Sequence, residues 1–295
     1  MRESEGLLMR RSLPVVVVAL ALIALWYLMA ITLNSAWTND RMAREGRVLT
    51  NAQHIADTWN QQKPRLPAPH QLAIELWDTV AMQAVSSKRS LLYHAWITLS
   101  ATLLGFAIGS GLGVLLAVGI VHNRAMDLSV MPWAIASQTI PILAIAPMII
   151  VVLNAIGISG LIPKAIISAY LSFFPVVVGM VKGLRSPDPI QLDQMQTWYA
   201  SKAATFWKLR LPSSVPYLFT SLKVGIAASL VGAIVGELPT GAVAGLGARL
   251  LSGSYYGQTI QIWSALFMAA SVAAALVTIV GLIERVVSKR MGFIR

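Results

Sequence analysis

Residues 13–33 read LPVVVVALALIALWYLMAITL, an apolar run long enough to cross a membrane and preceded by Arg10 and Arg11. A helix needs about 20 consecutive apolar residues to cross roughly 30 Å of hydrocarbon. A cleaved signal peptide has a shorter apolar core of about 7 to 15 residues. The run therefore predicts a retained helix, and residues 1–33 form an N-terminus with a first membrane crossing.

The whole chain has the composition of a membrane protein. It is 56% hydrophobic and 12% charged, whereas soluble domains average about 25% charged residues. Because lipid offers no partner to backbone polar groups, the crossings must be helices. The sequence predicts an all-α, polytopic membrane protein with about six transmembrane helices, the last five near His94–Ile120, Met131–Leu153, Leu161–Val181, Tyr217–Glu237 and Ile260–Val286.

These crossings divide the chain into a polar segment at 34–92, a five-helix core at 93–286 and a tail at 287–295. Lysine and arginine favour the cytoplasmic side of a membrane. Their distribution places both termini in the cytoplasm and makes 34–92 extracytoplasmic. The basic residues of this segment are Arg41, Arg44, Arg47, Lys63 and Arg65. They either favour the approach of an anion or form a solvated helix face.

Several function classes are excluded or disfavoured. The formal charge of +11 is explained by the placement of lysine and arginine beside membrane helices, so it does not indicate binding to nucleic acid. The absence of cysteine excludes thiolate catalysis and disulfides. The four histidines show no metal-ligand spacing, and no GxxxxGK[ST] pattern occurs. No side-chain cluster suggests catalysis, so we expect neither an enzyme nor a cofactor or metal in this chain.

Gly105, Gly109 and Gly113 recur at four-residue spacing in the second predicted helix. Small residues at this spacing let helix backbones approach closely in lipid. They predict a helix-packing seam.

Polar and proline residues inside later crossings mark a possible translocation path. Gln138, Thr139 and Pro141 lie together, and prolines in such helices either line a water-filled path or kink a packing helix. Glu237 ends the fifth crossing, where an acid is a functional candidate or caps the segment after it at the outer interface.

The stretch 182–216 is the longest polar interruption within the core. Pro187 and Pro189 break the preceding helix, and we expect two short helices, Ile190–Tyr199 and Lys202–Arg210, which Pro212 and Pro216 end. The residues themselves allow a helix lying on anionic lipid, a solvated loop or a docking element for a protein partner.

The order DQMQTWYASKAATFWKLRLPSSVP at 193–216 resembles the cytoplasmic EAA loop of permease subunits of ATP-binding-cassette importers. Asp193, Gln194 and Met195 stand where EAA would, Tyr199 replaces the glycine, and Arg210-Leu211-Pro212 forms the hydrophobic-Leu-Pro ending. Residues 66–80, 98–120 and 200–225 are similar to the nitrate, sulfonate and taurine permease family, and the likeness covers roughly residues 66–286.

The resemblance implies a type I importer permease fold in the inner membrane. It implies a homodimer that binds two ATPase subunits, which carry ATP and Mg, and an extracytoplasmic solute-binding protein. The loop at 182–216 would then couple to the ATPase through Asp193, Tyr199, Ala200, Ser201, Phe206, Trp207, Arg210, Leu211 and Pro212. Ala200 and Ser201 would form the contacting turn, and Phe206 and Trp207 would anchor the second helix on the membrane domain.

The resemblance also implies a small nitrogen- or sulfur-containing solute, of the nitrate, sulfonate, taurine or pyrimidine kind. The alternative is a secondary transporter or channel subunit without an ATPase partner. That class is expected to place paired ionisable residues at the membrane midplane.

Overall fold

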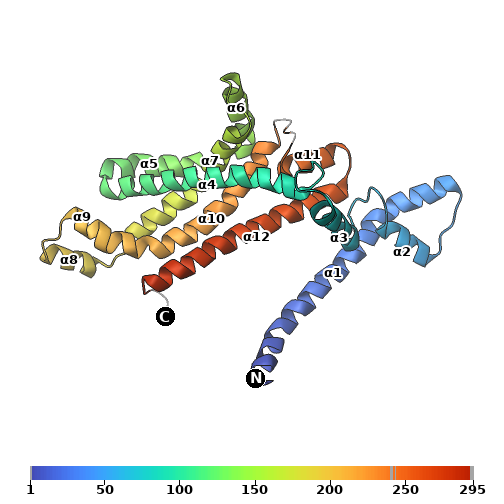
Figure 1. The fold of residues 1–295 in the computed structure, drawn as a ribbon, viewed down its shortest axis with the longest axis horizontal. Helices are drawn as coiled ribbons and strands as arrows, with labels where there is room; N and C mark the ends of the chain where they lie inside the picture. The colour runs from blue at the N-terminus through green and yellow to red at the C-terminus, as the bar shows by residue number, and fades with distance from the viewer. Residues whose placement is uncertain (1, 240–241, 243, 293–295) are drawn as a thin grey trace. The chain divides into compact units, whose positions relative to one another are not determined.

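The structure, a computed structural model, describes residues 2–239, 242 and 244–292. Every regular element in these ranges is helical (Figure 1). Among these described residues, five helices are long and apolar enough to cross a membrane, and a sixth crossing is present if one bent helix pair counts as a span. The chain divides into two compact units, Met1–Leu92 with Arg249–Phe267 and Tyr93–Ala248 with Met268–Arg295.

In the first unit, α1 (Arg2–Glu45) continues well past the predicted end of the first crossing at Leu33. No helix-breaking residue follows Leu33, and the helix ends only where Gly46 adopts a φ of 63°. The backbone N–H of Arg47 then donates to the carbonyl of Met42, as in a Schellman ending. The first part of the predicted extracytoplasmic segment is therefore a continuation of α1.

The rest of that segment folds back onto α1 as α2 (Asn51–Trp59), α3 (Pro69–Trp77) and a π-helical turn, η1 (Asp78–Met82). Asn34 holds the return, because its side-chain amide donates to the carbonyls of Thr58 and Leu66, each at 2.9 Å. Its Oδ1 accepts from the backbone N–H groups of Arg65 and Leu66. One buried amide thus orders a segment that composition alone describes only as polar.

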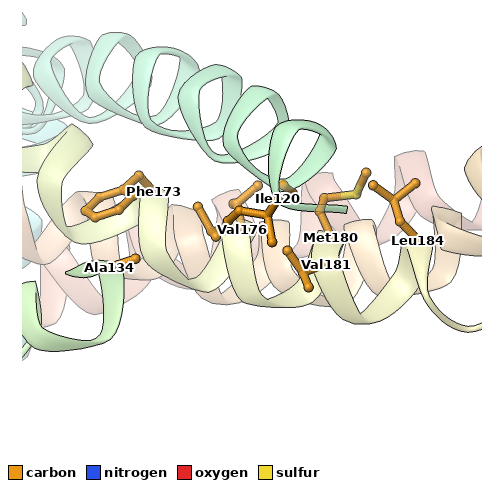
Figure 2. Packing of buried hydrophobic residues seen from close by; sticks show 9 residues of the cluster. Ile120, Ala134, Phe173, Val176, Met180, Val181 and Leu184 are labelled. Atoms are coloured by element: carbon orange, nitrogen blue, oxygen red, sulfur yellow. The ribbon is translucent and has the colours of Figure 1, made fainter. Parts of the chain in front are cut away.

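In the second unit, α7 (Leu161–Leu184) and α10 (Leu211–Glu237) pack side by side (Figure 1). α4 (Leu91–His122) lies against α7 from Tyr93 onward, and the C-terminal part of α12 (Thr259–Arg290) packs on α10. Figure 2 shows the core at one end of α7, where Val176, Met180 and Leu184 meet Ile120 of α4. The buried face of α7 makes it the central helix of this unit.

The third predicted crossing, Met131–Leu153, is not one straight helix. It is divided into α5 (Arg124–Ser137) and α6 (Ile142–Ala155), which meet at 98°. The break coincides with Pro141, which lacks an N–H and disfavours helical backbone in the residue before it. The hydroxyl of Tyr170 donates to the carbonyl of Ser137, which fixes the end of α5 to α7.

The second short helix of the 182–216 loop does not end at Pro212 or Pro216, so that prediction is wrong. Residues 202–237 form one continuous helical run through α9 (Lys202–Thr205), a π-helical turn, η2 (Phe206–Arg210), and α10. Pro212 lies just after the π-helical turn, and Pro216 lies within α10. The loop is therefore built directly onto a membrane-spanning helix.

Candidate functional site

The first half of the 182–216 loop is a short, well-capped helix, α8 (Pro189–Thr197). Asp188 caps its N-terminus by accepting from the backbone N–H of Ile190 at 2.9 Å, and Gln191 completes a capping box. Asp193 lies on α8 and is exposed. Leu192 lines a cleft with His122 and Arg210, so α8 lies beside the start of α10 and the end of α4.

Tyr199 ends α8 in a left-handed conformation, with a φ of 50°. Its N–H donates to the carbonyl of Gln196, and the N–H of Ala200 donates to that of Met195, which is the Schellman pattern. Glycine is the usual residue at this position because it bears no Cβ. Tyr199 thus adopts the backbone conformation that favours glycine, and its side chain is 97% exposed.

Ser201 begins the next helix. Its hydroxyl accepts from the backbone N–H of Ala204 at 3.1 Å, which caps α9. Ala200 is half-buried between the two helices. The turn from Tyr199 to Ser201 is therefore held by backbone hydrogen bonds on the α8 side and by the Ser201 side-chain cap on the α9 side.

Two side chains tie the loop to other membrane helices. Arg210 Nη1 donates to the carbonyl oxygen of Leu184, the last residue of α7, at 2.9 Å. Phe206 packs edge-on against His122 at the end of α4, with ring centroids 5.1 Å apart. Phe206 and Leu211 also contact the core cluster of Figure 2.

Trp207 does not anchor the second helix on the membrane domain as expected, because it is 66% exposed. It lies one residue from Phe206 and therefore points to a different side of the helical turn. Ile190 and Trp198 are also strongly exposed. The loop thus presents apolar side chains outward, while Phe206, Arg210 and Leu211 contact the rest of the second unit. Pro212 is half-buried at the start of α10.

The three glycines of α4 lie against α7. A Cβ on Gly105 would be 2.2 Å from Ser168 Cβ, and one on Gly109 would be 2.2 Å from Ser172 Oγ. A Cβ on Gly113 would be 2.9 Å from Val176 Cβ. The hydroxyl of Ser172 also reaches the carbonyl of Gly105, so backbone and side chains meet directly along this seam.

Gln138, Thr139 and Pro141 lie at the break between α5 and α6. Thr139 and Pro141 are exposed and Gln138 is half-buried. Glu237 is completely buried at the end of α10, and no hydrogen bond or ion pair in the described part of the chain joins it to Gln138 or Thr139. The polar contacts of the described residues thus do not join the expected path residues into one network.

Glu237 instead holds the segment that follows α10. Its carboxylate accepts from the backbone N–H of Gly247 at 2.8 Å and from the hydroxyl of Thr98 on α4 at 3.0 Å. Lys164 of α7 lies 3.6 Å away. This arrangement matches the interpretation of Glu237 as a cap for the segment after it.

His94, Thr98 and Lys164 complete this cluster and were missed by the sequence reasoning. His94 Nδ1 accepts from the N–H of Gly245, and Thr98 Oγ1 accepts from the N–H of Leu246, at 2.9 and 2.8 Å. The available signal was that His94 and Thr98 are polar residues one helical turn apart at the start of an apolar helix. Their partners lie about 150 positions away in sequence, so spacing alone does not reveal the cluster.

The long apolar helices, the close α4–α7 seam and the loop held between α7 and α10 define the class of a multi-pass helical membrane protein. The chain belongs to the family of binding-protein-dependent transport system inner membrane components, whose model matches residues 109–293. It has the type I importer permease fold of ATP-binding-cassette transporters. It is an inner-membrane transport protein rather than an enzyme.

Curated relatives carry different solutes according to their names. The formylaminopyrimidine transport permease protein ThiX of Halalkalibacterium halodurans is 32% identical over 183 residues, 62% of this chain and 68% of the relative. The riboflavin transport system permease protein RibX of Chloroflexus aurantiacus is 34% identical over 224 residues, 75% of this chain and 78% of the relative. The putative aliphatic sulfonates transport permease protein SsuC of Bacillus subtilis is 24% identical over 192 residues, 65% and 68% of the two chains.

Proposed function

We propose that this chain forms the translocation path of an importer and couples it to separate ATPase subunits through the loop at 182–216. The observation that carries the proposal is the construction of this loop. It exposes Trp198, Tyr199 and Trp207, while Arg210 and Phe206 fasten it to α7 and α4. Exposed aromatic side chains on a rigid support are typical of a protein-docking surface.

The same construction provides a lever. η2 leads into α10 without a break, and Arg210 binds the end of α7. A partner that shifts the Tyr199–Ser201 turn therefore moves two membrane helices together. ATP binding and hydrolysis on the partner then bias the permease between inward- and outward-facing states by differential affinity for each.

The proposed assembly contains a second copy of this chain, two ATPase subunits with their ATP and Mg, and an extracytoplasmic solute-binding protein, within membrane lipid. The 182–216 loop faces the cytoplasm together with both termini. The segment at 34–92 faces the other side, as the lysine and arginine distribution predicts. The solute is small and contains nitrogen or sulfur, as do the solutes that the relatives' names give.

The test is affinity purification of the chain from its native membrane in mild detergent, with mass spectrometry of the proteins that accompany it. We expect an ATPase with a nucleotide-binding motif to accompany the natural chain. The double variant Trp198→Glu, Trp207→Glu should lose it, because two charges are introduced into the docking surface.

The matched control is Tyr255→Glu with Tyr256→Glu, a pair of aromatics that is at least as exposed but lies outside the loop. This control should retain the ATPase. Equal recovery of the ATPase with both double variants would refute docking through the loop, and recovery of no ATPase with the natural chain would refute the importer assembly.

A further inference from the structure

The cleft that Leu192, His122 and Arg210 line has a volume of about 500 Å³ and lies within the second unit. Its walls come mainly from α8, from the end of α4 and from the helical run of α9 and η2. Val121 and Ala200 add apolar surface to that of Leu192, and the rest of the lining is polar or charged. Small-molecule sites of this size typically combine apolar walls with a few placed polar groups. The cleft is therefore large enough for a polar group that carries an organic body.

Two positive charges line this cleft, on Lys202 and Arg210, and none of the described residues that line it is acidic. In the part of the chain that the structure describes, neither cation forms an ion pair. Asp193 follows Leu192 on α8, but it is exposed and does not line the cleft. A cleft with charges of one sign attracts and concentrates ions of the opposite sign. The cleft therefore favours an anion.

Two walls of the cleft are held in position by hydrogen bonds to helix carbonyls. Arg210 Nη1 donates to the carbonyl of Leu184 at 2.9 Å, and the guanidinium group has further N–H donors for a ligand. His122 Nδ1 lies 2.8 Å from the carbonyl oxygen of Val118 and donates to it, since a carbonyl oxygen can only accept. Groups that are already ordered lose little conformational entropy when a ligand binds. These two side chains are therefore prepared for an anion before it arrives.

The charge of the cleft favours one class of anion over others. A carboxylate or a nitrate ion has a single negative charge, whereas a phosphate monoester carries about −1.5 to −2 at pH 7 together with strong acceptor oxygens. The fork of a guanidinium group matches two oxygens of a phosphate, and a lysine ammonium group acts toward phosphate as a point charge. A phosphate monoester thus offsets both cations and engages Arg210 and Lys202 together.

We propose that the cleft binds the phosphate monoester group of a small organic molecule, with Arg210 and Lys202 as binding residues and Leu192 against the organic body. Such a molecule contacts α4, α8 and η2 together, so it holds the 182–216 loop in one position. The binding depends on this chain alone, whereas the effect on coupling through the loop rests on the proposed function. The group is common to phosphorylated metabolites and to the headgroup of phosphatidic acid.

The absence of cysteine from the chain allows binding to be measured in the full-length protein. Gln196 lines the cleft and is exposed, so Gln196→Cys provides a single thiol whose labelling by N-ethylmaleimide can be timed in detergent. We expect glycerol 3-phosphate to slow this labelling saturably, by at least about threefold when its concentration exceeds about twice the dissociation constant. Acetate at the same ionic strength should have little effect. Gln194→Cys is the matched control, because it is exposed on the same helix but does not line the cleft, and neither ion should slow its labelling.

Substitutions in the Gln196→Cys background identify the binding residue. Lys202→Met should abolish protection by glycerol 3-phosphate, and Lys202→Arg should retain it by keeping the charge. Lys208→Met removes an exposed cation that does not line the cleft and should leave protection unchanged. Both lysines are exposed, so neither substitution removes buried packing. Equal protection by acetate, or equal loss of protection in Lys202→Met and Lys208→Met, would overturn the proposal.

Reconstituted vesicles distinguish the two sources of the phosphate group. The Gln196→Cys variant is placed in phosphatidylcholine vesicles with or without phosphatidic acid. Slower labelling with phosphatidic acid, and no further protection by glycerol 3-phosphate, would identify the lipid headgroup as the occupant. Equal labelling in the two vesicles, with protection by glycerol 3-phosphate, would identify a soluble metabolite. Protection by neither compound would overturn the proposal. Because these assays need no ATPase, their outcome is distinct from that of the docking test.

Discussion

Arg210 donates a hydrogen bond to the backbone carbonyl oxygen of Leu184, which joins the start of α10 to the last residue of α7. The four carbonyls at a helix C-terminus lack partners within the helix, and a cation there also interacts favourably with the helix dipole. This single contact therefore stabilises the end of α7 and fixes the 182–216 loop to it.

Arg210→Ala should lower the free energy of unfolding by about 1.5–3 kcal/mol, the range for a hydrogen bond to a charged group. It should also reduce solute-stimulated ATP hydrolysis in the reconstituted assembly more than it reduces ATPase binding. Thermal unfolding in detergent and ATPase assays measure the two effects. Lys208→Ala removes an exposed cation from the same turn and should change neither quantity. Equal effects of the two substitutions would contradict the role of the Leu184 contact.

Gly105→Ala should destabilise the protein by about 1–3 kcal/mol, as overpacking of a close contact does. The new methyl group would lie 2.2 Å from Ser168 Cβ and 2.6 Å from the carbonyl oxygen of Ala165, and neither group can move without shifting α7. Gly111→Ala on the same helix is the control, because nothing lies within 4 Å of its added Cβ. Thermal unfolding of the two purified variants should therefore differ clearly, and equal melting temperatures would exclude a close α4–α7 seam.

Patterns within one segment predicted much of the fold. Runs such as residues 13–33 and 161–181 predicted helices, because crossing lipid demands a long apolar helix whatever its neighbours are. The helix class, the number of crossings and the family were confirmed. The positions of the 182–216 loop and of the glycine spacing were readable for the same reason, since both are local.

Features that depend on distant partners were not predictable. The continuity of α9 with α10 past Pro212 depends on the π-helical turn before it. A kink at Pro141 was readable from the proline itself, but the 98° angle between α5 and α6 was not. The cluster around Glu237 joins residues of α4, α7 and α10 that no spacing rule connects. The outward position of Trp207 follows from the packing of Phe206, which sequence alone does not orient.

Tyr199→Gly should stabilise the 182–216 loop by up to about 1 kcal/mol. The left-handed conformation costs an L-residue about 1–2 kcal/mol, and glycine removes this cost. Part of the gain is lost, because glycine also increases the conformational entropy of the unfolded chain. No packing is lost, since the side chain is 97% exposed. Hydrogen exchange of the Ala200 amide, which donates to Met195, reports the local change. Trp198→Gly, at a position with an ordinary φ of −82°, should instead destabilise the loop and speed exchange of the Ala200 amide. Faster exchange in Tyr199→Gly would contradict the assigned turn.

Glu237→Ala should cost about 3–5 kcal/mol, the typical result of removing one partner of a buried ion pair. The substitution leaves the Lys164 ammonium group without its counter-charge and the Gly247 amide without its acceptor. The double variant Lys164→Met, Glu237→Gln should recover part of this loss, because it removes both charges and keeps an acceptor for Gly247. Melting temperatures of Lys164→Met, of Glu237→Gln and of the double variant complete a mutant cycle that measures the coupling, and strictly additive losses would show that the pair does not interact.

Glu75 makes the stability of the first unit depend on pH. Burial raises the pKa of Glu75 above its ordinary value of 4.5, nearby Arg249 lowers it and Asp78 raises it. Ionisation is then harder in the folded state than in the unfolded one, so stability is greatest below pH 4.5 and decreases as the pH rises through the raised pKa. Glu75→Gln should therefore raise the melting temperature at pH 8 and leave it nearly unchanged at pH 4. The exposed Asp40→Asn is the control and should show no such difference. A larger gain for Glu75→Gln at pH 4 than at pH 8 would reverse the assigned sign.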